Sequence, residues 1–349
     1  QGAELTVVDP KHQDLPKAYR SFPHGLEDMP AAVRSSVDLW SVCCPTAEHL
    51  PVLRTILARD PEARVLLEKP ACQAHEIDAF AALLTSNRNA RIVITDQYRH
   101  ARALDALADL MHRLEPDTPP DHVTVTFSKD RTGDITRGRF VDRSYGLLGY
   151  EWLHMLAVMG RVIPPAAMAA YLATHWQHTE LSATYDRQLF VSALTERTVV
   201  TDGPHRLHVD LTSSITGPTV VLGSTPRTTH GDDRHWRQGL RPADNSHRHL
   251  AVQAGRTRFT VHLDPVTAPG GWQLNRNHHR ITAERDGTVL HDEVVHDSPL
   301  HTAIQQAATT LLGTHPLPEP NLQPLRRISA LAELLRAQRP ASHATQDSA

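Results

Sequence analysis

The stretch Val65-Leu66-Leu67-Glu68-Lys69-Pro70 is a short apolar run that ends in an acid, a base and a proline. Only four of the 36 basic side chains are lysines, so a lysine after a buried strand is not background composition. Proline ends a β-ladder and keeps the preceding residue extended, which directs Lys69 out of the sheet. Because ligands bind at the carboxyl ends of strands in open α/β sheets, the hexapeptide marks a candidate site. A surface Glu68-Lys69 pair before a turn is the alternative.

The surrounding sequence has the pattern of a βαβ unit. Residues 37–44 form an apolar run that ends in a Pro45-Thr46 turn, and residues 49–58 show helical spacing of apolar positions. Strand, helix and the strand of residues 65–67 follow within about thirty residues, as in a βαβ unit. A further β-run at residues 91–95 precedes Gln97-Tyr98-Arg99.

Together these motifs resemble the signature of the Gfo/Idh/MocA family, named after glucose-fructose oxidoreductase and inositol dehydrogenase. The family pattern is a strand, a Pro-Thr turn with a nearby histidine, a helix, a strand ending in Glu-Lys-Pro, and an Asn-Tyr-Arg segment; here Gln97 replaces the asparagine. The resemblance covers roughly residues 1–160. It implies a Rossmann-type nucleotide-binding domain followed by an α+β domain with a large, mostly antiparallel sheet, and it implies NAD(P) as cofactor. The expected cofactor-binding residues are Asp9, Cys44, Pro45, Thr46, His49, Glu68, Lys69, Gln97 and Arg99.

Asp9 ends a short β-run and is expected to bind the adenosine ribose. In dinucleotide folds an acid at the end of the second strand accepts hydrogen bonds from the ribose hydroxyls. Its carboxylate repels a 2′-phosphate, which favours NAD over NADP, although nearby Lys11 softens the preference. An aspartate that simply starts a turn before Pro10 is the alternative. The first strand and Gly-rich loop of such a fold do not precede Asp9, and Gln1 is not a start methionine, so we expect the chain to lack its natural beginning. A degenerate member of the fold that cannot hold a pyrophosphate is the alternative.

A second constellation lies at Tyr150 and His154. Residues 145–156 have helical spacing, which places the two side chains one turn apart on the same face. The resembled family carries Asp-x-x-x-His here, facing the nicotinamide and the substrate carbon; His154 matches the histidine and Tyr150 stands at the aspartate position. Glu151 is offset by about 100 degrees on an α-helix, so it is not expected to replace the acid. Tyr150 can donate a proton if a nearby ammonium, Lys69, lowers its pKa.

The chain predicts three regions. Residues 1–118 are the nucleotide-binding domain, with helices at 74–84 and 103–114. Residues 119–315 are the α+β domain, because alternating β-runs begin after a Pro-rich break at 115–120. Residues 316–349 are a linker, a terminal helix that packs back on the first domain in the resembled family, and a disordered tail. The expected strands are residues 122–127, 206–211, 258–263 and 279–284, with a hairpin turn at 285–288.

Composition limits the partners. A net charge of -3 without basic runs argues against nucleic acid, and no apolar stretch reaches the length of a membrane span. Three cysteines suit a reducing, cytoplasmic compartment, and the scarcity of lysine hints at a GC-rich bacterial genome. No metal is expected: the densest histidine groups are His278-His279, His247 with His249, and His230 with His235, and none has regular ligand spacing. Residues 231–249 are expected to be a surface loop or lid.

The sequence therefore predicts an NAD(P)-dependent oxidoreductase that acts on a carbinol or carbonyl carbon of a small polar substrate, a sugar, cyclitol or biosynthetic intermediate. Lys69, with His154 and Tyr150, is expected to handle the proton; Tyr98, Tyr150 and His154 are expected to contact the substrate. A homo-oligomer is expected through an exposed apolar face of the sheet within residues 122–300. The rival hypothesis is a non-catalytic or scaffold member of the fold that has lost nucleotide binding.

Overall fold

The computed structural model describes residues 4–9, 20–22, 24–216, 241–242, 246–266 and 272–340. Most of the expected lid at residues 231–249 and most of the expected tail lie outside these ranges. Within the described residues, no helix is both long and apolar enough to cross a membrane.

Short parallel strands build the first domain. β1 (Thr6–Val8) pairs with β2 (Arg20–Phe22), and β4 (Arg64–Leu67) lies between β3 (Trp40–Val42) and β5 (Arg91–Ile94). Val65 of β4 joins the main core, whereas Leu66 packs on the opposite face against Ala307 and Leu311. β4 is thus covered on both faces, as apolar strands of parallel sheets are. The Rossmann-type arrangement is confirmed, with its strands in a two-stranded and a three-stranded sheet.

Helices and helical turns alternate with these strands. They are η1 (Leu26–Asp28), α1 (Ala31–Arg34), α2 (Thr46–Arg59), η2 (Ala74–Glu76), α3 (Ile77–Ser86), η3 (Gln97–His100) and α4 (Arg102–Leu114).

An eight-stranded sheet in the order β15-β14-β12-β11-β6-β9-β8-β7 dominates the second domain. β6 and β9 run parallel, and all other neighbours in this sheet are antiparallel, which confirms the expected α+β domain. Its strands are β6 (His122–Ser128), β7 (Thr179–Asp186), β8 (Phe190–Asp202), β9 (His205–Ser214), β11 (His247–Ala254), β12 (Thr257–His262), β14 (His278–Arg285) and β15 (Thr288–His296). The short strands β10 (Arg241–Pro242) and β13 (Trp272–Gln273) form a separate antiparallel pair.

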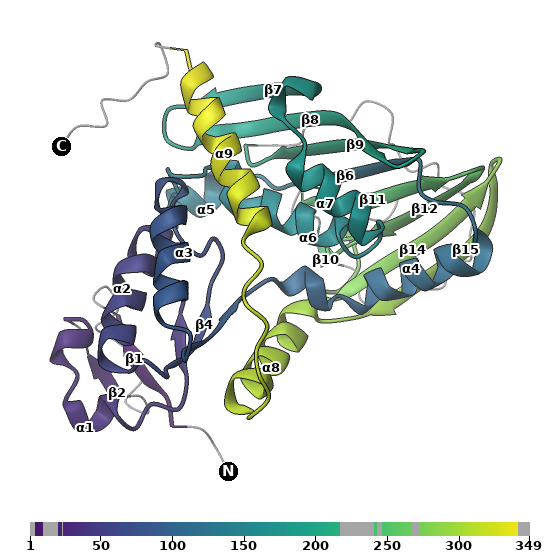
Figure 1. Cartoon of the computed structure of the whole chain (residues 1–349). Coiled ribbons are helices and arrows are strands. Elements are labelled where there is room, and N and C mark those ends of the chain that lie inside the picture. The colour runs from purple at the N-terminus through teal and green to yellow at the C-terminus, as the bar shows by residue number, and fades with distance from the viewer. Residues whose placement is uncertain are drawn as a thin grey trace.

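Helices cover one face of the large sheet (Figure 1). The remaining helical segments are α5 (Thr132–Thr136), the π-helical turn η4 (Leu148–Trp152), α6 (Leu153–Met159), α7 (Pro165–Ala173), η5 (Trp176–His178), α8 (Pro299–Leu312) and α9 (Gln323–Gln338). α6 contacts β6, α7 contacts β8, and α4 contacts β12 and β14. α8, in contrast, packs on β4, β5 and η3 of the first domain. The packing of α4 and α8 therefore does not follow the sequence boundaries at residues 118 and 315.

The terminal helix α9 ties the two domains together. It contacts η2 and α3 of the first domain and η4, α6 and α7 of the second. Arg327 of α9 donates from Nη2 to Glu196 Oε1 on β8 at 2.5 Å, and both side chains are almost fully buried. A buried ion pair requires both partners, because either charge alone is costly in the core.

The face of the large sheet opposite the helices differs from the exposed apolar face that we expected. A row of neighbouring residues runs across all eight strands and comprises Glu180, Arg197, Asp210, Thr124, Ala251, Thr260, Thr282 and Asp292. Seven of these eight residues are polar and the eighth, Ala251, is buried, so this row of the described strands lacks the exposed apolar side chains on which the expected homo-oligomer was based. Threonine satisfies both requirements of such a face, because it favours strands and tolerates water. Oligomerisation through the sheet stays a prediction, but an exposed apolar face no longer supports it.

Candidate active site

Lys69 leaves the end of β4 and crosses to the π-helical turn η4. Its Nζ donates to the backbone carbonyls of Gly149 at 2.8 Å and Tyr150 at 2.9 Å. Burial lowers the Lys69 pKa to about 8, although the carboxylates of Glu151 and Glu68 act in the opposite direction. Lys69 is therefore not one half of a surface ion pair with Glu68, and that alternative is wrong.

The two carbonyls leave one position on Lys69 unused within the described residues. An ammonium has three N–H groups, and two of them are held by Gly149 and Tyr150. A neutral amine keeps two N–H groups and gains a lone pair. Lys69 can therefore gain or lose one proton at the remaining position without giving up either hydrogen bond.

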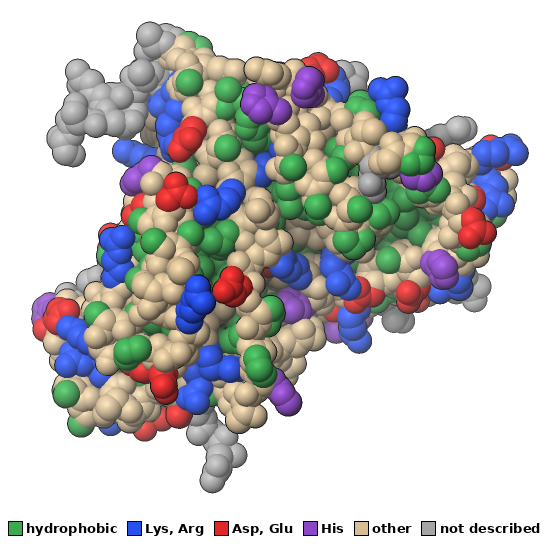
Figure 2. Space-filling view, viewed as in Figure 1, with side chains coloured by type: hydrophobic (Ala, Val, Ile, Leu, Met, Phe, Trp, Pro, Cys, Tyr) green, Lys and Arg blue, Asp and Glu red, His purple; other side chains and the backbone are tan. Residues whose placement is uncertain are grey.

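Acidic and thiol side chains follow the parallel strands at the same edge. Asp9 follows β1, Cys43 and Cys44 follow β3, and Glu68 follows β4. Burial raises the pKa of the Cys43 thiol, and the nearby charges of Glu68 and Asp9 raise it further. Because that electrostatic effect requires proximity, the carboxyl ends of β1, β3 and β4 meet at one edge, where α/β folds bind ligands. Figure 2 shows Lys, Arg and His side chains gathered in the hollow between the two domains.

His49 and Thr46 brace this edge from the first turn of α2. His49 Nδ1 lies 2.8 Å from the carbonyl of Pro70, and Nε2 lies 2.8 Å from the carbonyl of Cys44. Thr46 Oγ1 donates to Asp142 Oδ2 at 3.2 Å. Since backbone carbonyls occupy both nitrogens of His49, the ring fixes the loops around Pro45 and Pro70. Cofactor binding by His49 stays a prediction, and its two contacts with backbone carbonyls give the ring a structural role.

Asp96, which sequence analysis missed, follows β5. Its Oδ2 accepts from Arg99 Nε at 3.1 Å, whereas Oδ1 is buried without a hydrogen-bond partner in the described part of the chain. Burial raises the Asp96 pKa to about 6, opposed by the positive charges of Arg99 and Lys69. A buried acceptor without a hydrogen bond costs free energy, so this oxygen is suited to accept a hydrogen bond from a bound ligand. The sequence did carry a signal for Asp96, because this acid follows a β-run directly before Gln97, as Glu68 follows the run of residues 65–67.

Tyr98 connects Asp96 to the helix that carries His154. Its ring is buried and meets the His154 ring edge-on, with centroids 5.0 Å apart. His154 Nδ1 is buried with no hydrogen-bond partner among the described residues. Burial, followed by the charges of Lys69, Arg248 and Arg131, lowers the His154 pKa well below its ordinary value. His154 is therefore a neutral imidazole that lies within the electrostatic reach of Lys69.

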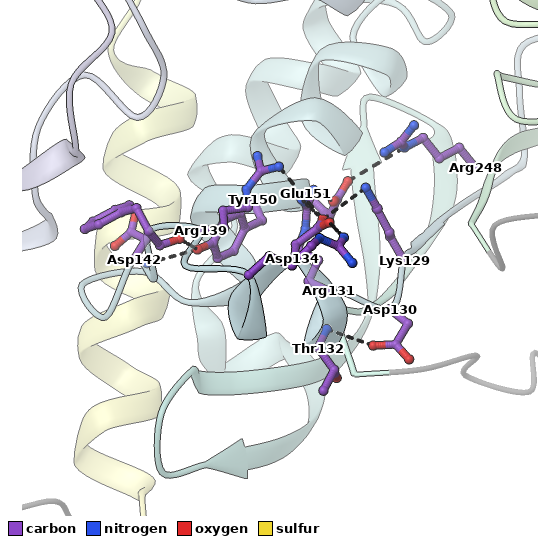
Figure 3. A network of polar contacts seen from close by, with 12 residues as sticks. Lys129, Asp130, Arg131, Thr132, Asp134, Arg139, Asp142, Tyr150, Glu151 and Arg248 are labelled. Carbon is purple, nitrogen blue, oxygen red and sulfur yellow. Dashed lines mark hydrogen bonds and ion pairs between the residues drawn. The ribbon is translucent and has the colours of Figure 1, made fainter. Parts of the chain in front are cut away.

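The Tyr150 phenol lies beside Asp142 (Figure 3). Its hydroxyl donates to the carbonyl of Phe140 at 2.7 Å and accepts from the backbone N–H of Asp142 at 3.0 Å. Burial raises the Tyr150 pKa. The expectation that Lys69 lowers this pKa is wrong, because Lys69 contacts the Tyr150 backbone and not its hydroxyl.

Glu151, the residue after Tyr150, is the buried acid of this turn. Its side chain is 1% exposed, forms a hydrogen-bonded ion pair with Arg131, and places Oε2 3.8 Å from Arg248 Nε (Figure 3). Burial by itself raises the Glu151 pKa, but Arg248, Arg131 and Lys69 outweigh it and the pKa is lowered. The sequence estimate assumed an ordinary α-helix, whereas residues 148–152 form a π-helical turn with a different angular spacing.

The polar groups at this edge fit a nicotinamide dinucleotide. Asp9 places a carboxylate directly after β1, and the first turn of α2 presents backbone N–H groups that lack intrahelical acceptors. Asp96 Oδ1 and His154 Nδ1 are buried polar atoms that a ligand can satisfy. No group of three or more His, Cys, Asp or Glu side chains that could hold a metal ion occurs among the described residues.

Solved structures share this fold. The 3-ketoreductase KijD10 from Actinomadura kijaniata, in complex with NADP and TDP-benzene, is 13% identical, with a TM-score of 0.58 over 92% of this chain and 83% of that one. UDP-N-acetylglucosamine 3-dehydrogenase GnnA from Acidithiobacillus ferrooxidans is 15% identical, with a TM-score of 0.55 over 91% and 82%. A Gfo/Idh/MocA family oxidoreductase from Vibrio cholerae is 9% identical, with a TM-score of 0.53 over 92% and 83%.

No protein-family model and no curated protein sequence matches the chain. At these identities the likeness is one of fold, and it agrees with the resemblance carried by the Pro-Thr turn, Glu68-Lys69-Pro70 and His154. The chain therefore has the fold of the Gfo/Idh/MocA oxidoreductases, as its sequence predicted.

Proposed function

We propose that the protein is an NAD(P)-dependent oxidoreductase in which Lys69 transfers the proton. The observation that carries this proposal is the Lys69 ammonium, anchored on the Gly149 and Tyr150 carbonyls with one position left for a ligand. A lysine acts as an acid or base near neutrality only when burial or a neighbouring charge lowers its pKa, and burial does so here.

A nicotinamide dinucleotide bound at the strand ends supplies the hydride donor or acceptor. In the oxidation direction, neutral Lys69 takes the proton of the substrate hydroxyl; in the reduction direction, its ammonium returns the proton to the carbonyl oxygen. His154, as a neutral imidazole, has one nitrogen available to hydrogen-bond the substrate and hold it beside Lys69. Asp96 Oδ1 accepts a hydrogen bond from a hydroxyl group of the substrate or of the cofactor ribose.

The substrate we propose is a polar molecule with a carbinol or carbonyl carbon, such as a sugar or cyclitol. Two structures with this fold are named as a ketoreductase and a sugar-nucleotide dehydrogenase, which supports this class. The arrangement of Lys69, His154 and Asp96 also suits a ligand with neighbouring hydroxyls, because it offers both donors and acceptors.

A nucleotide titration tests the proposal. Fluorescence titration of the full-length protein is expected to show binding of NADH and NADPH, with NADH tighter because the Asp9 carboxylate repels the 2′-phosphate. The variant Asp9→Ala is expected to reduce that difference. Although KijD10 is described with NADP, Asp9 is the reason we propose NAD for this chain. A lack of binding of either nucleotide would refute the enzyme and favour a non-catalytic protein, and a clear NADPH preference would refute the role of Asp9.

A substrate screen follows from the titration. Sugars and cyclitols are incubated with NAD, and NADH formation is followed by absorbance. Turnover of at least one polyol is expected, and the substrate found serves the kinetic tests below.

A further inference from the structure

Glu151 belongs to the turn η4, and Lys69 binds the backbone of the same turn. Lys69 donates to the carbonyls of the two residues that directly precede Glu151 in η4. Glu151 is 1% exposed, and its Oε2 has no hydrogen bond within the described residues. A buried carboxylate is costly unless it offsets other buried charges.

Two arginines from separate elements fix the Glu151 carboxylate. Arg131 follows β6, and its backbone N–H donates to the carbonyl of Ile215 at 2.9 Å, which anchors the residue. Arg248 lies on β11 and donates from Nη1 to the carbonyl of Asp264 at 3.1 Å. Arg131 pairs with one carboxylate oxygen and Arg248 approaches the other (Figure 3). The negative charge of Glu151 is thus held in place and cannot swing to the surface.

We propose that Glu151 is a positioning residue for the proposed reaction: its buried carboxylate, fixed by Arg131 and Arg248, sets the pH at which Lys69 exchanges its proton. This inference rests on the proposed function of Lys69. It assigns to Glu151 the electrostatic role of an acid beside the lysine.

The charges around Lys69 agree with this assignment. Glu151 in η4, Glu68 at the end of β4 and Asp96 after β5 favour the ammonium form, whereas Arg131 disfavours it. Among these charges Glu151 has the largest effect. The Lys69 charge in turn acts on two further buried groups, Asp142 and His154.

Opposite substitutions should therefore move Lys69 in opposite directions. Glu151→Gln removes a negative charge, so the ammonium is less favoured and the pKa of Lys69 falls. Arg131→Gln removes a positive charge while Arg248 still faces Glu151, so the ammonium is more favoured and the pKa rises. A neighbouring charge of this kind typically moves a pKa by about one unit. A merely structural defect has no reason to give shifts of opposite sign.

NMR titration of the protein labelled with 13C-lysine measures this directly. The chain has only four lysines, and Lys69→Arg identifies the Lys69 signal by its loss. The 13Cε shift of Lys69 is followed against pH in wild type, Glu151→Gln, Glu151→Asp and Arg131→Gln. The matched control is Glu62→Gln, which removes the same charge from an exposed site.

We expect the Lys69 midpoint to fall by about one pH unit in Glu151→Gln, to rise in Arg131→Gln, and to stay near wild type in Glu151→Asp and Glu62→Gln. An unchanged midpoint in Glu151→Gln overturns the proposal. If Glu151→Gln does not fold, because two arginines lose their partner, the Arg131→Gln variant decides: a rise supports the proposal, and no change or a fall overturns it. The measurement needs no substrate, so it can fail while Lys69 remains essential for turnover, and the proposed function can fail while the midpoints shift.

Discussion

Turnover by the wild-type protein is expected to change with pH around 8, in opposite senses for the two reaction directions. The oxidation needs neutral Lys69, so kcat/KM should rise as the pH passes through the Lys69 pKa and then level off. The reduction needs the ammonium, so kcat/KM should fall over the same range. The physical cause is burial, which lowers the Lys69 pKa from 10.5 to about 8.

The size of the effect follows from that pKa. With a pKa of about 8, the neutral fraction of Lys69 is roughly 10% at pH 7 and roughly 90% at pH 9, so the oxidation should accelerate roughly ninefold. With the ordinary value of 10.5, the neutral fraction at pH 7 would be only roughly 0.03%, about 300-fold less. Burial therefore makes Lys69 a usable base near neutrality.

Initial rates between pH 6 and about 10, in both directions and with saturating nucleotide, test this reasoning. The substrate is the one identified by the screen, and protein stability over the same pH range is the control. Profiles that lack an inflection between pH 7 and about 9, or that bend in the same sense in both directions, would refute it.

The structure makes three further predictions. Arg327→Ala should destabilise the fold by about 3–5 kcal/mol in chemical denaturation, because it leaves Glu196 charged and unpaired in the core; the double variant Arg327→Met with Glu196→Gln should recover part of the loss, and equal losses would contradict the pairing. Tyr150→Phe should change turnover by less than about tenfold while lowering stability by about 1 kcal/mol, since the hydroxyl bonds Phe140 and Asp142; a loss of ~10² or more would restore Tyr150 as a proton donor. Copies of the chain are expected to pair through the large sheet, so light scattering should give a mass above the 38.8 kDa of one chain; a monomer at micromolar concentration would contradict this prediction.

The parts of the fold that were predictable from the sequence have local signals. The apolar run of β4 followed by Lys69 and Pro70 needs only neighbouring residues, and the helix expected at residues 103–114 corresponds to α4 (Arg102–Leu114). The turn expected at residues 285–288 joins β14 to β15, and its Asp286 and Gly287 have positive φ, which favours small turn residues.

The remaining parts depend on long-range contacts or on departures from ideal geometry. Arg131 and Arg248 are far apart in sequence and meet at Glu151 only because β6 and β11 are neighbours in the sheet. The burial of Glu151 was not predicted, and the sequence gives no sign of the π-helical turn at residues 148–152. Asp96 was overlooked because the family motif begins one residue later, at Gln97.

The role of Lys69 is tested most directly by comparing the turnover of Lys69→Ala and Lys69→Arg with wild type. Both variants should lose at least ~10²-fold in kcat, the lower end for general acid-base catalysis, because guanidinium keeps the charge but not an exchangeable proton near neutrality. NADH affinity should stay within several-fold, circular dichroism should show a folded protein, and Lys129→Ala should keep wild-type turnover, since Lys129 pairs with Asp134 instead. Near-wild-type turnover of Lys69→Ala would contradict the assignment of Lys69 as the proton-transfer group.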